Sequence, residues 1–261
     1  MKKYKRIVIK IGTATLTHPT GQLNIRLTEK LIKVISDLKN SGKEIVLVSS
    51  GAIGVGAGKL GLSKRPSDLP SKQACAAVGQ CELMYIYDKL FGAYNHTVAQ
   101  VLLTRDAVDQ PTRRQYIENT FGRLLEMGTI PIVNENDTVA VEEIVFGDND
   151  TLSAIVAKAV GAELLIILSD IDGLYDKNPK EYPDAKLIPV VHRITPEIEA
   201  AAGGKGSEFG TGGMITKLHA AQIAMDSHCS MLILNGKDPD ILYDCFDGKA
   251  VGTLFEEEEE A

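Results

Sequence analysis

Two short polar and acidic segments lie close together near the middle of the chain. The first runs from Asn134 to Thr138 and the second from Phe146 to Asp150, with a short apolar run between them. Carboxylates crowded in this way repel one another, so a fold keeps them only where positive charge satisfies them. The pattern therefore predicts a receptor for a cationic group and for the lysines of an active site.

Two lysines lie beside glycine-rich turns elsewhere in the chain. Lys10 is near the end of an apolar run and is followed by Gly12, beside which backbone N–H groups can approach a phosphate. Lys217 falls one turn into a predicted helix, after a loop with three glycines between residues 210 and 213. Taken alone, each has an ordinary interpretation: Lys10 as a lysine that reaches the surface, and the loop as a plain glycine-rich connection.

The two lysines and the acidic segments become informative together. Asp150, at the start of a predicted helix, is placed to orient both ammonium groups, and such a set is typical of phosphoryl transfer, where positioning and electrostatics supply nearly all of the catalysis. Two other nucleotide motifs fit poorly. The region of Lys59 lacks the Walker A spacing, and glycines 56, 58 and 61 satisfy GxGxxG but lie too far past the strand to favour a nicotinamide site.

The elements that must position these residues alternate along the chain. Apolar runs without polar alternation predict strands buried on both faces, at residues 7–11, 45–48, 98–103, 130–133, 164–168 and 231–234. Helical patterns lie at 27–38, 72–91, 113–127, 151–160 and 214–225, and 139–146 looks like a hairpin extension. We therefore expect an α/β fold, a three-layer αβα sandwich with a mainly parallel central sheet. Ligands then bind beyond the carboxyl ends of the strands, the edge that gathers Gly12, Ser50, Asn134 and Ser169.

Composition narrows the class of protein. The chain has 261 residues and a formal net charge of −7, which argues against nucleic acid as the main partner but not against an anionic substrate. No apolar run approaches the ~18 residues of a membrane span, and no secretory segment opens the chain, so we expect no membrane partner and a cytoplasmic location. The four cysteines are expected to be reduced and buried, with a zinc site as the minor alternative. Residues 256–261 form an acidic tail, expected to be a solvated end.

Several segments resemble the amino acid kinases, and among them the glutamate 5-kinases, over residues 10–255. They include KIGTATLT, SSGAIGVG, LSDIDGLYDKNP and GTGGMITKLHAA, and the most discriminating are NENDTV and FGDND. The resemblance implies phosphorylation of the γ-carboxylate of L-glutamate with ATP and Mg²⁺, the first step of proline synthesis. It also implies one kinase domain over residues 1–255, with the glutamate and phosphoryl site mainly before about residue 165 and the nucleotide site mainly after it. The C-terminal PUA domain of longer members is not expected.

The resemblance also implies roles for individual residues. Lys10 would hold the transferring phosphoryl group, Lys217 the leaving oxygen and Asp150 both lysines, while Gly12 and Gly51 would offer backbone N–H groups. Glutamate would be bound by Ser50, Asp137 and Asn149, with Asn134 and Asp148 nearby. The nucleotide would contact Lys10, Ser169, Asp170, Thr211, Gly212, Gly213, Met214, Ile215, Thr216 and Lys217. No metal ligand from the protein is expected, because Mg²⁺ would be held mainly through the phosphates of ATP.

Partners and alternatives follow from the same resemblance. We expect a homo-oligomer, a dimer or tetramer, feedback inhibition by proline, and a product passed to glutamate-5-semialdehyde dehydrogenase. The helix at 72–91, with Met84, Tyr85 and Tyr87, is interpreted as core in preference to a contact with a partner chain. Another kinase of this fold, such as an N-acetylglutamate kinase, is disfavoured because an acylated amine needs no acidic wall. A non-catalytic amino acid or nucleotide sensor is disfavoured by the presence of Lys10, Lys217 and Asp150.

Overall fold

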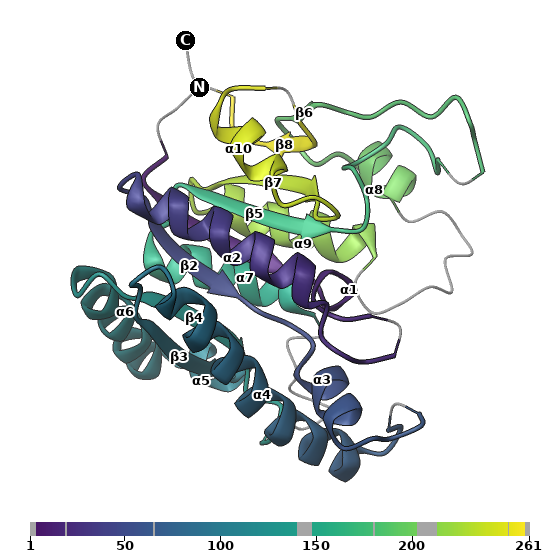
Figure 1. The fold of residues 1–261 in the computed structure, drawn as a ribbon. Coiled ribbons are helices and arrows are strands. Elements are labelled where there is room, and N and C mark those ends of the chain that lie inside the picture. The colour runs from purple at the N-terminus through teal and green to yellow at the C-terminus, as the bar shows by residue number, and fades with distance from the viewer. Residues whose placement is uncertain are drawn as a thin grey trace.

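A computed structural model describes residues 4–18, 20–64, 66–139, 148–179, 181–202, 213–249 and 251–258. Its strands form one twisted sheet in the order β3-β4-β2-β1-β5-β7-β8-β6 (Figure 1). Neighbouring strands are parallel except for β7 and β8, which pair antiparallel. The strands are β1 Arg6–Ile11, β2 Glu44–Val48, β3 Val98–Leu103, β4 Ile130–Glu135, β5 Leu164–Ser169, β6 Val190–Val191, β7 Ser230–Asn235 and β8 Thr253–Phe255.

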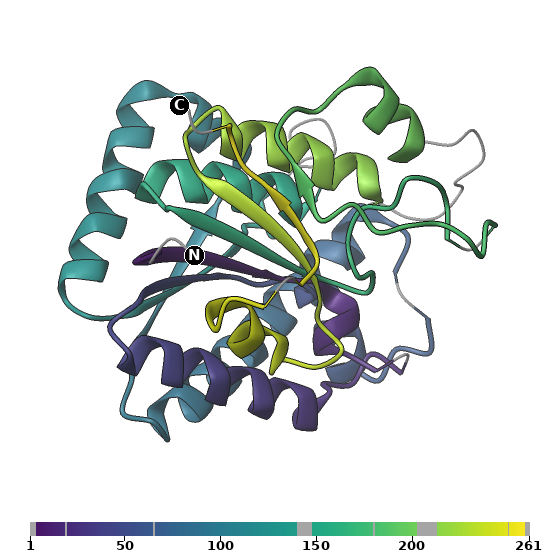
Figure 2. The same cartoon turned by 90° about the horizontal axis from the view of Figure 1, so that it is seen from above.

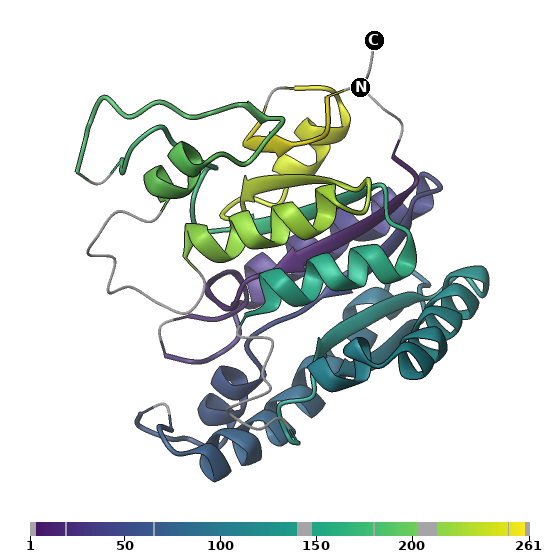
Figure 3. The ribbon, with the colours of Figure 1, turned by 180° about the vertical axis from the view of Figure 1, so that it is seen from behind.

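Helices cover both faces of the sheet, which gives the three layers that the sequence predicts (Figure 2). Helices α6, α7 and α9 pack on one face, as the view from behind shows (Figure 3), and α2, α4 and α10 pack on the other. The helices are α1 Thr13–Leu16, α2 Ile25–Asn40, α3 Ala52–Lys59, α4 Leu69–Gly92, α5 Arg105–Asp109, α6 Pro111–Glu126, α7 Asn149–Val160, α8 Pro196–Ala202, α9 Met214–Met225 and α10 Ile241–Phe246.

Alternation along β1 shows how the two cores are separated. Ile7, Ile9 and Ile11 face the layer of α2 and α4, whereas Val8 faces the layer of α7 and α9. Successive side chains of a strand point to opposite faces. Lys10 therefore lies on the same face as Val8, beneath α7 and α9, and this placement brings its ammonium group to the residues described below.

The predicted elements are confirmed, with ends shifted by up to three residues. The short strands β6 and β8 and the short helices α1, α5, α8 and α10 were not predicted, because elements of two to seven residues carry too little periodicity. The predicted hairpin at 139–146 lies, from residue 140 onward, outside the described residues. In the part of the chain that is described, no helix is both long and apolar enough to cross a membrane.

One expectation, which concerns the cysteines, needs correction. Cys81 is exposed on α4, so the prediction that all four cysteines are buried is wrong; Cys75, Cys229 and Cys245 are buried, and all four are free thiols. The GxGxxG match does not form a phosphate turn, because Gly56 and Gly58 lie inside helix α3. The motif is therefore part of a helix, in agreement with the expectation that this spacing does not favour a nicotinamide site.

Candidate active site

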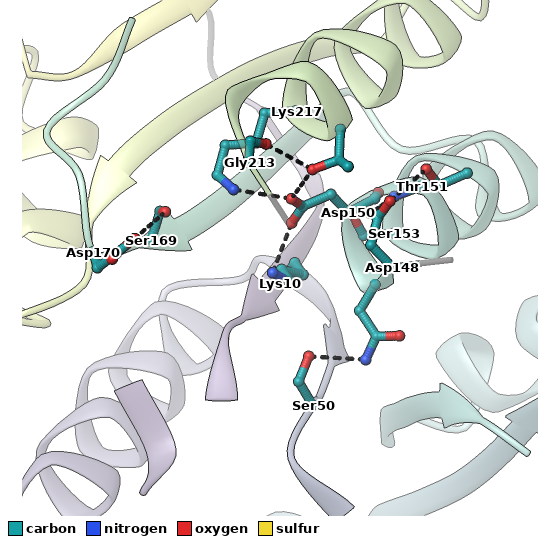
Figure 4. Close-up of polar contacts among 12 residues, drawn as sticks. Lys10, Ser50, Asp148, Asp150, Thr151, Ser153, Ser169, Asp170, Gly213 and Lys217 are labelled. Atoms are coloured by element: carbon teal, nitrogen blue, oxygen red, sulfur yellow. Dashed lines mark hydrogen bonds and ion pairs between the residues drawn. The ribbon is translucent and has the colours of Figure 1, made fainter. Parts of the chain in front are cut away.

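Lys10, Asp150 and Lys217 form a buried group of charges at the carboxyl end of the sheet (Figure 4). The Nζ atom of Lys10 lies 2.6 Å from Oδ1 of Asp150, and Nζ of Lys217 lies 3.0 Å from Oδ2 of the same carboxylate. The side chains of Asp150 and Lys217 are 1% and 5% exposed, and that of Lys10 is 11% exposed. Two cations from β1 and α9 thus share one carboxylate from α7.

Local structure explains why the carboxylate lies at this point. Helix α7 begins at Asn149, two residues before the predicted start, because the side chain of Asp148 caps it by accepting from the backbone N–H of Thr151 at 2.8 Å. Asp150 therefore lies in the first turn, where a negative charge is favoured by the helix dipole. Thr216 adds a hydroxyl that donates to Oδ2 at 3.1 Å.

The electrostatics of Asp150 are a balance of opposing effects. Burial alone raises the pKa of this carboxyl group, but the charges and hydrogen bonds of Lys10 and Lys217 outweigh burial and hold the pKa below its ordinary value. The carboxylate therefore stays ionised at neutral pH. It can keep two ammonium groups close together in a place where, without it, they would repel each other.

Glycine turns bring helix N-termini to the same edge. Gly51 precedes α3 with a φ of +91°, a left-handed conformation that strains any residue with a Cβ atom. No side chain caps α3 at Gly51, and none caps α1 at Gly12. The first N–H groups of a helix lack acceptors in a preceding turn, and residues of both turns line the cleft, so an anion bound there could accept from such groups.

A network of amides forms the opposite side of the site. Nδ2 of Asn149 donates to the carbonyl oxygen of Ser49 at 2.7 Å, and it lies 2.8 Å from Oγ of Ser50 and 3.1 Å from Oδ1 of Asn134. Nδ2 of Asn134 in turn donates to Oε1 of Gln80 on α4 at 2.9 Å. The ends of β2 and β4 and the start of α7 are therefore tied together.

The cleft between these groups has a volume of about 350 Å³. The structure brings to it most of the predicted residues, namely Lys10, Gly12, Ser50, Gly51, Asn134, Asp137, Asp148, Asn149, Asp150, Ser169, Asp170 and Lys217. Sequence reasoning gave no individual role to the other lining residues, although Glu135 lies within the acidic segment that it predicted as a receptor; they are Thr13, Ala14, Thr15, Ala52, Ile53, Glu135 and Leu168. Most of these directly adjoin a predicted residue, and that adjacency was the signal available.

The structure describes only part of the predicted nucleotide-binding segment. Thr211 and Gly212 lie outside the described residues. Gly213, Met214, Ile215 and Thr216 lie at the start of α9 and are not among the residues that line the cleft, although Thr216 contacts Asp150. Their contact with a nucleotide stays a prediction.

Comparison with known proteins decides the family. The model of the amino acid kinase family matches residues 5–235. The chain belongs to this family. Among the amino acid kinases similar to it is the glutamate 5-kinase of Listeria innocua, 58% identical over 264 residues that cover all of this chain and 96% of the relative. The glutamate 5-kinase of Clostridium perfringens is 56% identical and covers 98% of this chain and 96% of the relative. The resemblance to glutamate 5-kinases seen in the sequence motifs is thereby confirmed.

Solved structures agree on the amino acid kinase fold. The UMP kinase of Bacillus anthracis superposes with a TM-score of 0.67 at 19% identity, over 99% of this chain and 98% of that one. The isopentenyl phosphate kinase of T. acidophilum superposes with a TM-score of 0.65 at 17% identity, over 97% and 100% of the two chains. At these identities the similarity supports the fold alone.

Proposed function

We propose that this amino acid kinase transfers the γ-phosphoryl group of ATP to the γ-carboxylate of L-glutamate and so forms γ-glutamyl phosphate. Glutamate 5-kinases are among the relatives that match nearly the whole chain. The observation that carries the mechanism is the buried group of Lys10, Asp150 and Lys217, which concentrates two positive charges beside uncapped helix N-termini. Such a site suits a reaction in which negative charge is brought together and then redistributed.

The nucleophile in this reaction needs no base. A glutamate side chain has a reference pKa of about 4.3, so its carboxylate is already ionised at neutral pH. The barrier lies in bringing that carboxylate up to a polyanionic phosphate, and Mg²⁺ bound with ATP would neutralise part of the phosphate charge. Among the described residues, no group of three or more His, Cys, Asp or Glu side chains is arranged to hold a metal ion. The resemblance to glutamate 5-kinases implies that Mg²⁺ is held mainly through the phosphates of ATP.

The two lysines and the glycine turns offset the remaining charge. Lys10, from β1, would contact the transferring phosphoryl group, and Lys217, from α9, the oxygen that leaves with ADP. The backbone N–H groups after Gly12 and Gly51 would bind phosphoryl oxygens as negative charge develops on them. Asp150 would contribute by positioning both ammonium groups before the substrates arrive, which lowers the cost of ordering them during the reaction.

The acidic side of the cleft suits the other end of glutamate. Asp137, Asp148 and Asn149 line it together with Ser50 and Asn134. Carboxylate and amide oxygens favour an ammonium group, whereas an acylated amine carries no charge to satisfy them. This side of the cleft therefore favours glutamate over N-acetylglutamate. Ser169 and Asp170, at the end of β5, would lie toward the nucleotide, in keeping with a nucleotide site formed mainly by the chain after about residue 165.

Further parts of the proposal rest on the resemblance to glutamate 5-kinases. The reaction would be the first step of proline synthesis, in the cytoplasm, with the product passed to glutamate-5-semialdehyde dehydrogenase. Feedback inhibition by proline and assembly into a dimer or tetramer belong to the same proposal. Light scattering measures the number of subunits, and activity measured with and without proline tests the feedback.

Trapping of the product with hydroxylamine tests the function. The purified protein, supplied with ATP, Mg²⁺ and L-glutamate, should form glutamyl hydroxamate, and omission of any one of the three should abolish the signal. Parallel reactions with N-acetylglutamate and aspartate serve as controls for the acceptor. Turnover only with one of those acceptors would overturn the assignment of glutamate. Calorimetry that shows binding of glutamate and ATP without turnover would instead support a sensor.

A further inference from the structure

We propose that Gln80, on helix α4, is a positioning residue that determines whether the cleft presents a hydrogen-bond acceptor or a donor to the amino group of the substrate. Gln80 is 8% exposed and is not among the residues that line the cleft. It acts through Asn134 and Asn149, and Tyr87 on the same helix supports the arrangement. The inference rests on the proposed function, because it concerns how glutamate is told apart from acids that lack an amino group.

The first link joins Gln80 to Asn134. Oε1 of Gln80 accepts a hydrogen bond from Nδ2 of Asn134 at 2.9 Å, and Asn134 is 2% exposed. The oxygen and the nitrogen of a side-chain amide occupy similar space, so the partners decide which atom faces which way. With its nitrogen turned to Gln80, Asn134 must turn its oxygen the other way. That oxygen accepts from the backbone N–H of Glu135 at 2.9 Å and from Nδ2 of Asn149 at 3.1 Å.

The second link joins Asn134 to Asn149. Three acceptors surround Nδ2 of Asn149: Oδ1 of Asn134, the carbonyl oxygen of Ser49 and Oγ of Ser50. An amide whose nitrogen faces these atoms has its oxygen on the opposite side. Asn149 lines the cleft, and we assign Oδ1, an acceptor, to the side that faces the substrate. A flipped Asn149 would present a donor there, and a donor repels an ammonium group.

The hydrogen bonds from Gln80 through Asn134 to Asn149 form a relay, and contacts of helix α4 with its neighbours fix the position of Gln80. Tyr87 lies two turns after Gln80 on the same side of α4, is 1% exposed, and its hydroxyl lies 2.8 Å from Oγ of Ser49. A Cβ atom at Gly79 would come within 1.8 Å of the carbonyl oxygen of Ala52, so the backbones of α4 and α3 are in direct contact. The helix therefore contacts the ends of β4 and β2 and the turn that follows β2.

Two substitutions at Gln80 test whether the hydrogen-bond acceptor of the side chain, and not its volume, is responsible. Gln80→Met keeps the length of the side chain but removes the acceptor, whereas Gln80→Glu keeps an acceptor for Asn134. Calorimetry without ATP gives the Kd of each variant for L-glutamate and for glutarate, which lacks the amino group. We expect Gln80→Met to weaken glutamate binding about tenfold, equivalent to about 1.4 kcal/mol, and to leave glutarate binding within twofold. Gln80→Glu should stay close to the wild type.

The tyrosine offers a matched pair of variants. Tyr87→Phe removes the hydroxyl that contacts Ser49, and Tyr85→Phe removes a hydroxyl from a residue of the same helix that is 62% exposed. We expect a loss of selectivity for glutamate over glutarate of about threefold in the first variant and none in the second. Melting temperatures measured alongside identify variants whose fold has changed.

The outcomes distinguish this inference from the proposed function. Equal weakening of glutamate and glutarate binding in Gln80→Met, or no weakening of either, would overturn the relay. An equal loss in Gln80→Glu would do the same, because the acceptor would then not be the cause. Absence of glutamyl hydroxamate from the wild-type enzyme would overturn the proposed function alone, since the relay is measured by binding without turnover.

Discussion

Replacement of Asp150 by asparagine removes the negative charge between the two lysines while it keeps the size of the side chain. The carboxylate is 1% exposed and is paired at 2.6 Å and 3.0 Å, and removal of one partner from a buried ion pair costs about 3–5 kcal/mol. The asparagine retains a hydrogen-bond acceptor, so we expect the lower end, a loss of about 3 kcal/mol in the free energy of unfolding. For a chain of this size that is a decrease of about 6–12 °C in melting temperature.

The same variant should lose most of its turnover. Lys10 and Lys217 would no longer be positioned in advance, and removal of one preorganised group from such a site lowers kcat by about 10²–10³. ATP should restore more of the melting temperature in Asp150→Asn than in the wild type, because its phosphates supply the missing counter-charge. The assays are hydroxamate formation at saturating substrates and thermal unfolding with and without ATP. Asp88→Asn, an exposed change on α4, is the control and should stay within about 0.5 kcal/mol. A kcat within tenfold of the wild type, together with an unchanged melting temperature, would refute this reasoning.

Three further predictions concern the same cleft. Lys10→Ala and Lys217→Ala should each lower kcat by about 10² or more, as measured by hydroxamate formation, and near-normal turnover in both would show that the lysine roles are wrong. Asp137→Ala should raise the KM for glutamate about tenfold and change kcat and the KM for ATP far less; an equal rise in both KM values would contradict its assignment to the substrate ammonium. Acid should weaken the contribution of Asp150 to stability, because its pKa in the folded protein lies below the ordinary value of 3.8. The contribution is present above that value and is lost as pH falls through the folded pKa, so the stabilities of wild type and Asp150→Asn, followed by urea unfolding, should stay apart at pH 6 and begin to converge only as the pH falls below 3.8.

The sequence determined the elements and the chemistry. Continuous apolar runs and helical patterns predicted the parallel sheet and its layers, because strands buried on both faces must be apolar throughout. Lys10, Asp150 and Lys217 stood out because charged residues beside strand ends and glycine turns are costly unless they are used. The rule that ligands bind beyond the carboxyl ends of parallel strands then gathered residues more than 200 positions apart in sequence at one edge.

Other features could be decided only by the tertiary structure. That Lys10 and Lys217 share the two oxygens of one carboxylate depends on which face of β1 is turned toward α7 and α9. The place of Gln80 and Tyr87 beneath the cleft depends on how α4 packs across β2 and β4, and the local sequence of α4 does not reveal the hydrogen-bond partners of these two residues. A local sequence pattern reveals periodicity and turns, because residues close together in the chain determine both. The partner of a buried amide or charge is decided by packing between distant segments, so it became visible only when the layers were assembled.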